Sequence, residues 1–401
     1  MFRLDFIHRR PIGAVMAAAA LLIGVFLAWA SLALAATWTI QTTPNSGVEH
    51  SNLYDIDCRS SATKPCVSVG KLTESGGKSA PYAQSWNGTS WTNITAKSPE
   101  GATAGELQSV DCLSSELSEG IFCFAAGSYT SSGVTKSLIL GGSQAQLPTV
   151  ESTPNPEGAS ETALKGVACH PSLAACMAVG YSVKSGNKTA FATGLNSEFN
   201  WAIQSIPEPA GAISSELLGV DCPTSTFCVA VGSYAVSAGE PQWAWSATWN
   251  GTSWTLQTVA KPTSSQRSIL LDVSCESVSS CTGAGGYRLS GKQVSFVARW
   301  NGTAWSHQSS PNPAGSTNTV FQGVSCATGP CVAVGDWNNG KNWLPMAQEY
   351  NGSAWALDTT PNPEGATETI IEGVACRTGG CLSSGWYADS LGKRKTLGQT
   401  R

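Results

Sequence analysis

The unit that decides the fold reads WNGTAW at Trp300–Trp305, PNP at Pro311–Pro313, FQGVSC at Phe321–Cys326 and CVAVGDW at Cys331–Trp337. The chain of 401 residues carries this unit seven times in related form. Its 14 cysteines mark the copies, because they fall into seven close pairs whose first members lie 50 to 57 residues apart. A period of this length is typical of a β-propeller or another repeat array.

The cysteine pairs predict one disulfide within each unit, since an even set of paired cysteines behind an export signal is typical of a disulfide framework. The expected bonds are Cys58–Cys66, Cys112–Cys123, Cys169–Cys176, Cys222–Cys228, Cys275–Cys281, Cys326–Cys331 and Cys376–Cys381. Zinc would need ligands clustered in fours. The histidines after residue 36 are only His50, His170 and His307, at unmatched repeat positions. We therefore expect neither a metal nor a cofactor.

The first 35 residues predict a secretory signal. Arg3, Arg9 and Arg10 precede an uncharged run over residues 11–36, which contains the Ala-x-Ala cleavage pattern at Ala33–Ala35. The run is also long enough to span a bilayer as an uncleaved anchor, so cleavage is favoured and retention stays open. Either way residues 36–401 are expected outside the cytoplasm, secreted or at the cell surface. Membrane contact is expected only through residues 11–36.

Each unit is interpreted as four antiparallel strands. The first ends at the first cysteine, and the second begins at the second cysteine. Apolar residues stand five and two positions before each first cysteine, as at Leu107 and Val110. Because these positions have opposite parity, we expect them on opposite faces of a strand that lies between two sheets. A glycine four residues after each second cysteine, as at Gly335, predicts a bulge or a close backbone approach.

Asn-Gly pairs separate the third and fourth strands, as at Asn301-Gly302, and predict hairpin turns because both residues tolerate a positive φ. The tripeptides that begin with these pairs, such as Asn301-Gly302-Thr303, also match glycosylation acceptors. Their recurrence at one strand junction favours the turn. Proline-rich segments such as Pro311–Pro313 then connect each unit to the next. Proline suits such an extended connector because it cannot join a central ladder.

The two ends of the repeat region predict ring closure. The last unit supplies three strands, the third at about Arg394 to Thr400, and then stops. The missing fourth strand has its match at Thr37–Gln41, where Trp38 copies Trp305. The predicted fold is therefore all-β: a seven-bladed β-propeller with four antiparallel strands and one disulfide per blade. Its N-terminal strand completes the last blade, and residues 36–401 form one domain.

The Asn-Gly-Thr-x-Trp turns resemble the Asp-box hairpins of sialidase-type propellers and the turns of seven-bladed bacterial lectins. Over nearly all of residues 37–401 the chain most resembles secreted bacterial repeat proteins with Trp-Asn-Gly-x-x-Trp and Cys-x-Ala-Val-Gly units. The Ser-x-Asp portion of the Asp-box is absent, so the resemblance implies no sialidase chemistry. The second unit departs further: its turn is expected at Gly141-Gly142, and Pro148 stands where Trp305 stands in the sixth unit.

Two sets of aromatic residues recur. The tryptophans of the fourth strands are expected to pack between blades, since one structural position repeats: Trp38, Trp91, Trp201, Trp254, Trp305 and Trp355. The aromatics after the second strands are the candidate ligand-binding residues: Tyr129, Tyr181, Tyr234, Tyr287, Trp337 and Tyr387. One ring per blade suits multivalent sugar binding. The alternative, that these rings only cover blade edges, is slightly favoured.

Charge excludes one class of partner. Without residues 1–35 the chain has 20 Lys+Arg against 26 Asp+Glu, and no basic stripe is present, so nucleic-acid binding is not expected. Six lysines in the turns between second and third strands are interpreted as solvated edge charges. An extracellular glycan or protein remains the expected partner, and the chain is expected to be a monomer.

Two functions remain open. The favoured one is a non-catalytic extracellular binding or interaction module, carbohydrate-binding in the manner of a lectin. The alternative is a propeller-type hydrolase or lyase that acts on an extracellular polysaccharide. Catalysis needs a group that breaks the repeat, in a pocket with acid–base partners. The repeats contain no evident group of that kind, so no catalytic residue is predicted and an enzyme is less favoured than a binding module.

Overall fold

The computed structural model describes residues 37–45, 49–58, 65–114, 121–171, 176–238, 242–326 and 329–401. The predicted signal or anchor of residues 1–35 lies outside these residues. Thr37–Arg401 form one compact unit, built from strands and turns. None of the described segments is a helix with the length and hydropathy to cross a membrane.

The described strands number 28, and antiparallel pairing groups them into seven sets of four. The first three sets are β2 (His50–Cys58), β3 (Cys66–Thr73), β4 (Ser79–Trp86), β5 (Trp91–Ala96); β6 (Ala104–Ser114), β7 (Ile121–Ser131), β8 (Val134–Ser143), β9 (Gln146–Val150); and β10 (Glu161–Cys169), β11 (Cys176–Lys184), β12 (Asn187–Leu195), β13 (Trp201–Gln204).

The other four sets follow in chain order, except that the last one takes its fourth strand from the start of the unit. They are β14 (Ser214–Thr224), β15 (Phe227–Ala235), β16 (Trp243–Trp249), β17 (Trp254–Thr258); β18 (Arg267–Ser277), β19 (Ser280–Leu289), β20 (Lys292–Trp300), β21 (Trp305–Gln308); β22 (Asn318–Ser325), β23 (Cys331–Asn338), β24 (Trp343–Tyr350), β25 (Trp355–Asp358); and β26 (Glu368–Arg377), β27 (Gly380–Ala388), β28 (Arg394–Thr400), β1 (Thr39–Gln41).

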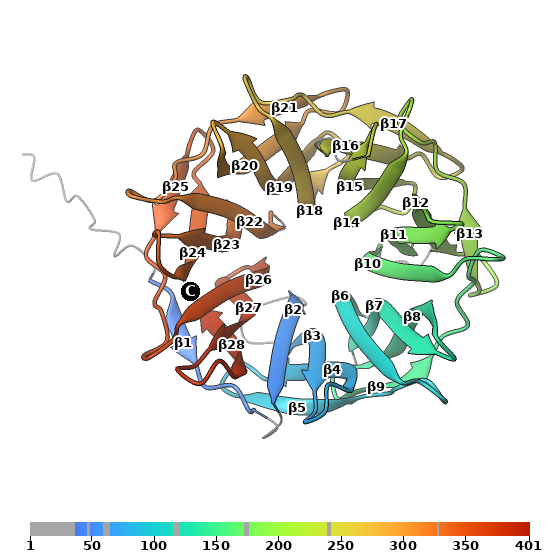
Figure 1. The fold of residues 1–401 in the computed structure, drawn as a ribbon, viewed down its shortest axis with the longest axis horizontal. Helices are drawn as coiled ribbons and strands as arrows, with labels where there is room; N and C mark the ends of the chain where they lie inside the picture. The colour runs from blue at the N-terminus through green and yellow to red at the C-terminus, as the bar shows by residue number, and fades with distance from the viewer. Residues whose placement is uncertain are drawn as a thin grey trace, which may run out of the picture. The chain divides into compact units, whose positions relative to one another are not determined.

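The first strands of the sets, β2, β6, β10, β14, β18, β22 and β26, are the inner strands, and Figure 1 shows them around a common centre. Each contacts the inner strand of the next set, and β26 also contacts β2. The last contact is close: a Cβ added to Gly373 of β26 would lie 2.8 Å from the Cα of Asp55 in β2. First and last sets therefore adjoin directly.

The N-terminal strand belongs to the last set, as the sequence predicts. Thr39 pairs with Thr400, and Gln41 pairs with Gly398. Trp38 is 3% exposed, and its Nε1 donates a hydrogen bond to Asp358 at 3.3 Å. The five other recurring tryptophans, Trp91, Trp201, Trp254, Trp305 and Trp355, are equally buried in the clusters between sets. This agrees with the expected packing role.

Each inner strand has a register shift four residues before its first cysteine, for example between Leu107 and Ser109. The glycine predicted to mark a bulge or a close approach lies opposite this shift. A Cβ added to Gly127 would lie 2.0 Å from the carbonyl oxygen of Glu106, so no other residue fits without movement. The bulge prediction is correct in position, but the extra residue stands on the inner strand.

The same bulge makes one prediction wrong. Residues five and two before the first cysteine were expected on opposite faces, yet Leu107 and Val110 pack in one cluster, with Val67 and Val69 of the preceding set. An extra residue between two positions changes their relative parity, so both side chains point toward the same neighbour. The apolar side chains at these two positions therefore do not cover both faces of the inner strand.

The Asn-Gly turns are hairpin loops as expected. In the loop between β20 and β21 only Gly302 takes a positive φ (96°), whereas Asn301 accepts hydrogen bonds at Oδ1 from the backbone N–H groups of Thr303 (3.0 Å) and Ala304 (2.9 Å). The second set differs from its prediction: Gly141 and Gly142 lie within β8, which turns after Ser143. Leu147, not Pro148, fills the buried position there.

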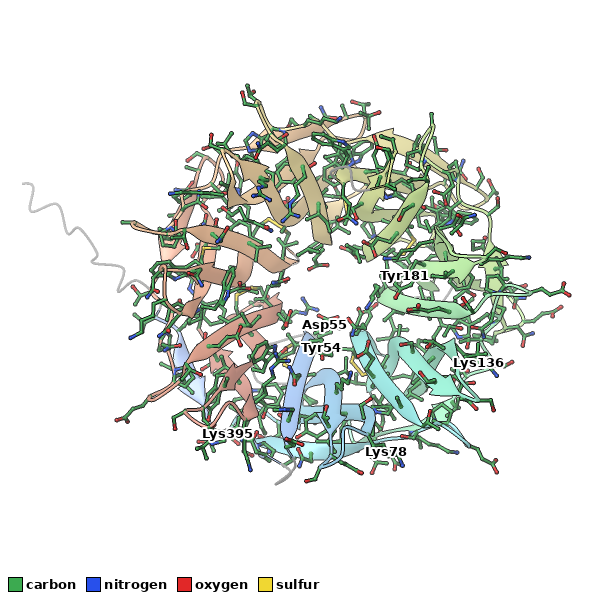
Figure 2. The ribbon with its side chains drawn as sticks, viewed as in Figure 1. Tyr54, Asp55, Lys78, Lys136, Tyr181 and Lys395 are labelled. Atoms are coloured by element: carbon green, nitrogen blue, oxygen red, sulfur yellow. A yellow bond between two sulfur atoms is a disulfide. The ribbon has the colours of Figure 1, made fainter. Side chains whose placement is uncertain are left out.

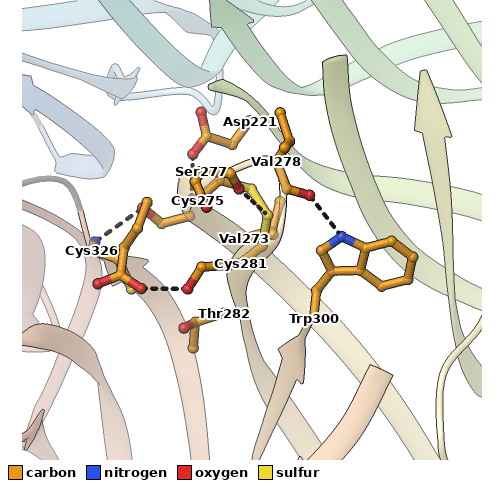
Figure 3. Close-up of a disulfide and its surroundings, with 12 residues drawn as sticks. Asp221, Val273, Cys275, Ser277, Val278, Cys281, Thr282, Trp300 and Cys326 are labelled. Atoms are coloured by element: carbon orange, nitrogen blue, oxygen red, sulfur yellow. Dashed lines mark hydrogen bonds between the residues drawn. A yellow bond between two sulfur atoms is a disulfide. The ribbon is translucent and has the colours of Figure 1, made fainter. Parts of the chain in front are cut away.

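All seven predicted disulfides are present within their own sets, with Cα–Cα distances of 3.9–4.1 Å, and no described cysteine is free. Figure 3 shows Cys275–Cys281 beside the loop that Trp300 closes by donating a hydrogen bond from Nε1 to the carbonyl of Val278 at 3.1 Å. Seven such bonds indicate that the chain folds in an oxidising environment.

Candidate functional site

Two adjoining cavities are lined by the inner strands. The disulfide-side cavity, of about 520 Å³, is lined by residues from three before each first cysteine to two after it. The mouth cavity, of about 80 Å³, is lined by residues two to four before the cysteine, and so lies nearer the proline-rich connectors. Asp55, Ser109, Val220 and Asp272 line both cavities.

The polar groups of the disulfide-side cavity bind the next set. Side chains one and three residues before a first cysteine accept hydrogen bonds from backbone N–H groups of the following inner strand. The pairs are Asp55 with Val110 (2.9 Å), Asp57 with Cys112 (2.9 Å), Ser109 with Val167 (3.2 Å), Asp111 with Cys169 (2.5 Å), Asp221 with Cys275 (2.6 Å), Asp272 with Val324 (2.8 Å), Ser274 with Cys326 (3.0 Å) and Ser325 with Cys376 (3.0 Å). We call them the cross-set acceptors. Figure 3 shows the one at Asp221.

Where the last set meets the first, an ion pair replaces this bond. Arg377 donates to the Asp57 carboxylate and to the carbonyl of Cys58, and the two charged side chains are only 15% and 12% exposed. Burial raises the pKa of Asp55 to about 6 and that of Asp272 to about 8, the Asp55 carboxylate adding to the second shift. These carboxylates hold adjacent sets together and have their acceptor atoms occupied.

The mouth cavity receives the residues at the seven bulges, which break the repeat. Four residues before the first cysteine stand Tyr54, Gln108, Lys165, Leu218, Leu271, Gln322 and Glu372, all half-buried and all lining this cavity. We call them the mouth residues. A β-bulge re-aims a side chain, and bulges recur beside functional sites. Seven equivalent bulges thus place five different side-chain types around one cavity.

Three mouth residues have partners within the protein. The indole Nε1 of Trp386 donates to Glu372 at 3.0 Å, Gln322 donates to Asp336 at 3.0 Å, and Gln108 donates to Glu106 at 2.9 Å. Burial raises the pKa of both Glu372 and Asp336 to about 7. The donors and acceptors of these side chains are therefore partly occupied before any ligand arrives.

Tyr54 and Lys165 differ from the other polar mouth residues. Among the described residues neither the Tyr54 hydroxyl nor the Lys165 ammonium has a hydrogen-bond or ion-pair partner. Burial, followed by the Glu106 and Glu372 carboxylates, raises the pKa of the Tyr54 phenol well above its usual value near 10, so the hydroxyl stays protonated. Figure 2 shows Tyr54 and Asp55 close to the centre, whereas Lys78, Lys136 and Lys395 lie toward the outside. A phenol and an ammonium group are thus available as donors.

The six sequence-predicted aromatics are half-buried, and all of them lie within the second strands rather than after them. Five of them pack against apolar clusters between sets: Tyr129, Tyr234, Tyr287, Trp337 and Tyr387. Tyr181 is one position closer to its cysteine and is different: its hydroxyl donates to Glu161 at 2.6 Å, and Lys188 lies 4.0 Å from its ring centroid. The structure brings none of the six into the mouth cavity, and ligand contact by them stays a prediction.

The mouth residues were missed by sequence reasoning, although a signal exists. In each unit the fourth position before the cysteine varies from tyrosine to lysine to glutamate between positions that stay apolar. Without knowledge of the bulge, this variation reads as a solvent-exposed strand position. As for metals, the described residues hold no group of three or more His, Cys, Asp or Glu side chains able to bind an ion.

Comparison with known proteins identifies the fold alone. No protein-family model matches the chain, and neither does any curated protein. Solved structures do match. A polysaccharide lyase of family PL25, an ulvan lyase, has a TM-score of 0.53 at 9% identity, covering 88% of this chain and 94% of the lyase. U3-55K has a TM-score of 0.52 at 11% identity, covering 91% and 98%. Trypanosoma rangeli sialidase scores 0.49 at 10% identity, covering 92% and 60%. The chain therefore has a propeller-like all-β fold.

Proposed function

We propose that this protein is an exported, non-catalytic carbohydrate-binding module whose ligand site is the mouth cavity. The observation that carries the proposal is the pair Tyr54 and Lys165: two donors with no partner among the described residues, at bulges that line a cavity where the repeat is broken. Hydroxyl-rich ligands are recognised by such donors and by nearby amides, here Gln108 and Gln322. A single asymmetric site replaces the six equivalent sites that the recurring aromatics would give.

The test begins with a glycan array probed with the purified, oxidised protein. Tyr54→Phe removes only the hydroxyl and should weaken binding of the best glycan about tenfold, the equivalent of one lost hydrogen bond. Tyr287→Phe is the matched control, since that ring packs in a cluster away from the mouth cavity. Equal effects of the two variants would contradict the proposed site. A blank array would contradict carbohydrate binding itself.

A second candidate is a polysaccharide lyase or hydrolase. It is supported by Glu372, whose pKa of about 7 suits proton transfer near neutral pH, and by the fold likeness to an ulvan lyase. In elimination, a base removes the proton α to a uronate carboxylate, a C=C bond forms, and the C–O bond to the leaving sugar breaks. The leaving oxygen takes up a proton and becomes a hydroxyl, so the net reaction moves one proton from carbon to oxygen. Ultraviolet absorbance of the unsaturated product measures elimination, and new reducing ends measure chain cleavage by either route. Turnover abolished in Glu372→Gln would replace the binding proposal with this one.

The architecture proposed with this function is a closed seven-bladed propeller. It is supported by the cyclic contacts of the inner strands and by the pairing of β1 with β28. Deleting residues 37–43 should lower Tm by more than about 5 °C, which is about 2 kcal/mol or more for a unit of this size, because an edge of β28 is exposed and Trp38 is lost. We expect a monomer on a sizing column for the parent and oligomers for the deletion. A deletion that matched the parent would refute closure by this strand.

A further inference from the structure

A groove between the fourth and fifth sets has a different character from the mouth. It has a volume of about 640 Å³ and is lined by the starts of β14 and β18, the ends of β15 and β19, and the loops that follow. Arg267 and Arg288 line it from one side. They are directly opposed partners in the register of β18 and β19, and both are exposed.

Two arginines directly opposite each other destabilise the pairing of β18 with β19. Like charges directly across a ladder repel by some tenths of a kcal/mol up to about 1 kcal/mol. The corresponding pair is His50 with Thr73 in the first set and Asn318 with Asn338 in the sixth, so the repeat itself does not require arginine. No described Asp or Glu lines the groove. The described lining residues therefore supply no negative charge to the two cations, in a chain whose net charge is negative.

One of the two guanidinium groups is held in place, and both keep donors for a ligand. Nη2 of Arg267 donates to Oε1 of Gln293 at 2.9 Å, which fixes that side chain while leaving its other donors available. Arg288 has no hydrogen-bond or ion-pair partner among the described residues. Ser214, Ser237 and Gln242 add neutral polar groups to the lining. Arginine forks match the oxygen geometry of sulfate and carboxylate groups.

We propose that this groove binds the anionic groups of an acidic polysaccharide, either sulfate esters or uronate carboxylates. The inference rests on the proposed carbohydrate function and narrows its ligand class. A polysaccharide fits better than a lipid surface, because the apolar lining is small: Ile213, Ala235 and Ala238. A glycan chain bound at the mouth cavity and in the groove would gain avidity from two contacts.

The test measures binding of the oxidised protein to immobilised dextran sulfate, polygalacturonate and uncharged dextran at fixed ionic strength. The double variant Arg267→Gln/Arg288→Gln should bind the charged polymers at least about tenfold more weakly. Its control is Lys78→Gln/Lys136→Gln, which makes the same change in net charge far from β18 and β19 (Figures 1 and 2) and should alter affinity less than about twofold. The two charged polymers separate sulfate from carboxylate recognition.

Equal losses in the two double variants would overturn the proposal, since net charge alone would then explain binding. Binding that is equally strong on anionic lipid vesicles and lost in the arginine variant would overturn it in favour of a membrane surface. Inorganic sulfate that competes as well as the polymer would also overturn it, because a free anion would then suffice. Charged polymers that bind the arginine variant as tightly as the parent, while Tyr54→Phe still weakens glycan binding, would refute the groove and leave the mouth proposal intact.

Discussion

The two cavities along the inner strands are lined by adjacent residues of the same strands, yet their side chains have different tasks. On the disulfide side, Asp221 and Ser325 are typical: each accepts a backbone N–H of the next set, and their positions are polar or small in every unit. At the mouth, one residue further from the first cysteine than the cross-set acceptors, Tyr54 and Lys165 have donors with no partner among the described residues. One strand thus combines a repeating structural edge with a non-repeating surface.

The difference shows that a buried carboxylate over a central cavity is not by itself a site. Asp55 and Asp272 have the raised pKa values that often mark catalytic groups. The carboxylate oxygens of both residues, however, accept hydrogen bonds from backbone N–H groups, as expected for a structural role. The proposed mouth site is supported instead by a broken repeat, a bulge at each mouth residue, and two donors that have no partner among the described residues.

The largest effect is expected where the structural side is broken. Arg377→Ala leaves the Asp57 carboxylate buried without its cation, which typically costs about 3–5 kcal/mol. Unfolding in urea should show this loss, while affinity of the remaining folded protein for its glycan stays unchanged within about twofold. The double variant Arg377→Met/Asp57→Asn should regain about half of the loss or more, because no charge is then left buried. Glycan binding lost in Arg377→Ala while the protein remains folded would erase the distinction between the two cavities.

A smaller effect is expected from pH at the mouth. The pKa of Glu372 is raised from 4.5 to about 7, so its folded state binds a proton that the unfolded state has released. Its contribution to stability is complete below about pH 4.5 and is lost as the pH rises through 7. Glu372→Gln keeps an acceptor for Trp386 and cannot ionise. Between pH 5 and 8 the variant should therefore lose about 2 kcal/mol less stability than the parent.

Urea midpoints measured at both pH values test this directly. Asp55, Asp272 and Asp336 also have raised pKa values, so the parent and the variant should both become less stable toward pH 8. Only the difference between them belongs to Glu372. Identical pH profiles would mean that the Glu372 carboxyl is as well solvated in the folded state as in the unfolded state.

The fold was predictable because its determinants are local and repeated. Cysteine spacing predicts the disulfides, and the Asn-Gly pairs predict the turns between third and fourth strands. Trp38 identifies the N-terminal strand as the fourth strand of the last set. The site was not predictable in the same way, because the bulge at Tyr54 and its equivalents depends on how the inner strand pairs with the glycine of the second strand. The alternation of faces along a strand is interrupted at a bulge, so the sequence alone predicts opposite faces for Leu107 and Val110. For the same reason the sequence does not reveal that the residue four before each first cysteine lines a cavity.

Tyr181 differs from the other five candidate aromatics for a related reason. Spacing from the second cysteine puts this ring one residue earlier than Tyr129 or Tyr234, and on a strand one residue reverses the face. Its contacts with Glu161 and Lys188 are polar, while the other five rings pack against apolar clusters. Exact register, rather than residue type, separates the two environments.

The most direct test of the account is a matched pair of alanine variants, one on each side of the inner strands. Ser325→Ala removes the acceptor for Cys376 and should cost about 1–3 kcal/mol of stability with no change in glycan affinity. Lys165→Ala should leave stability within about 0.5 kcal/mol and weaken glycan binding about tenfold or more. Kd and urea midpoints measured on the same preparations give both quantities. Opposite patterns in the two variants are the predicted result; the same pattern in both would contradict the division between a structural side and a binding mouth.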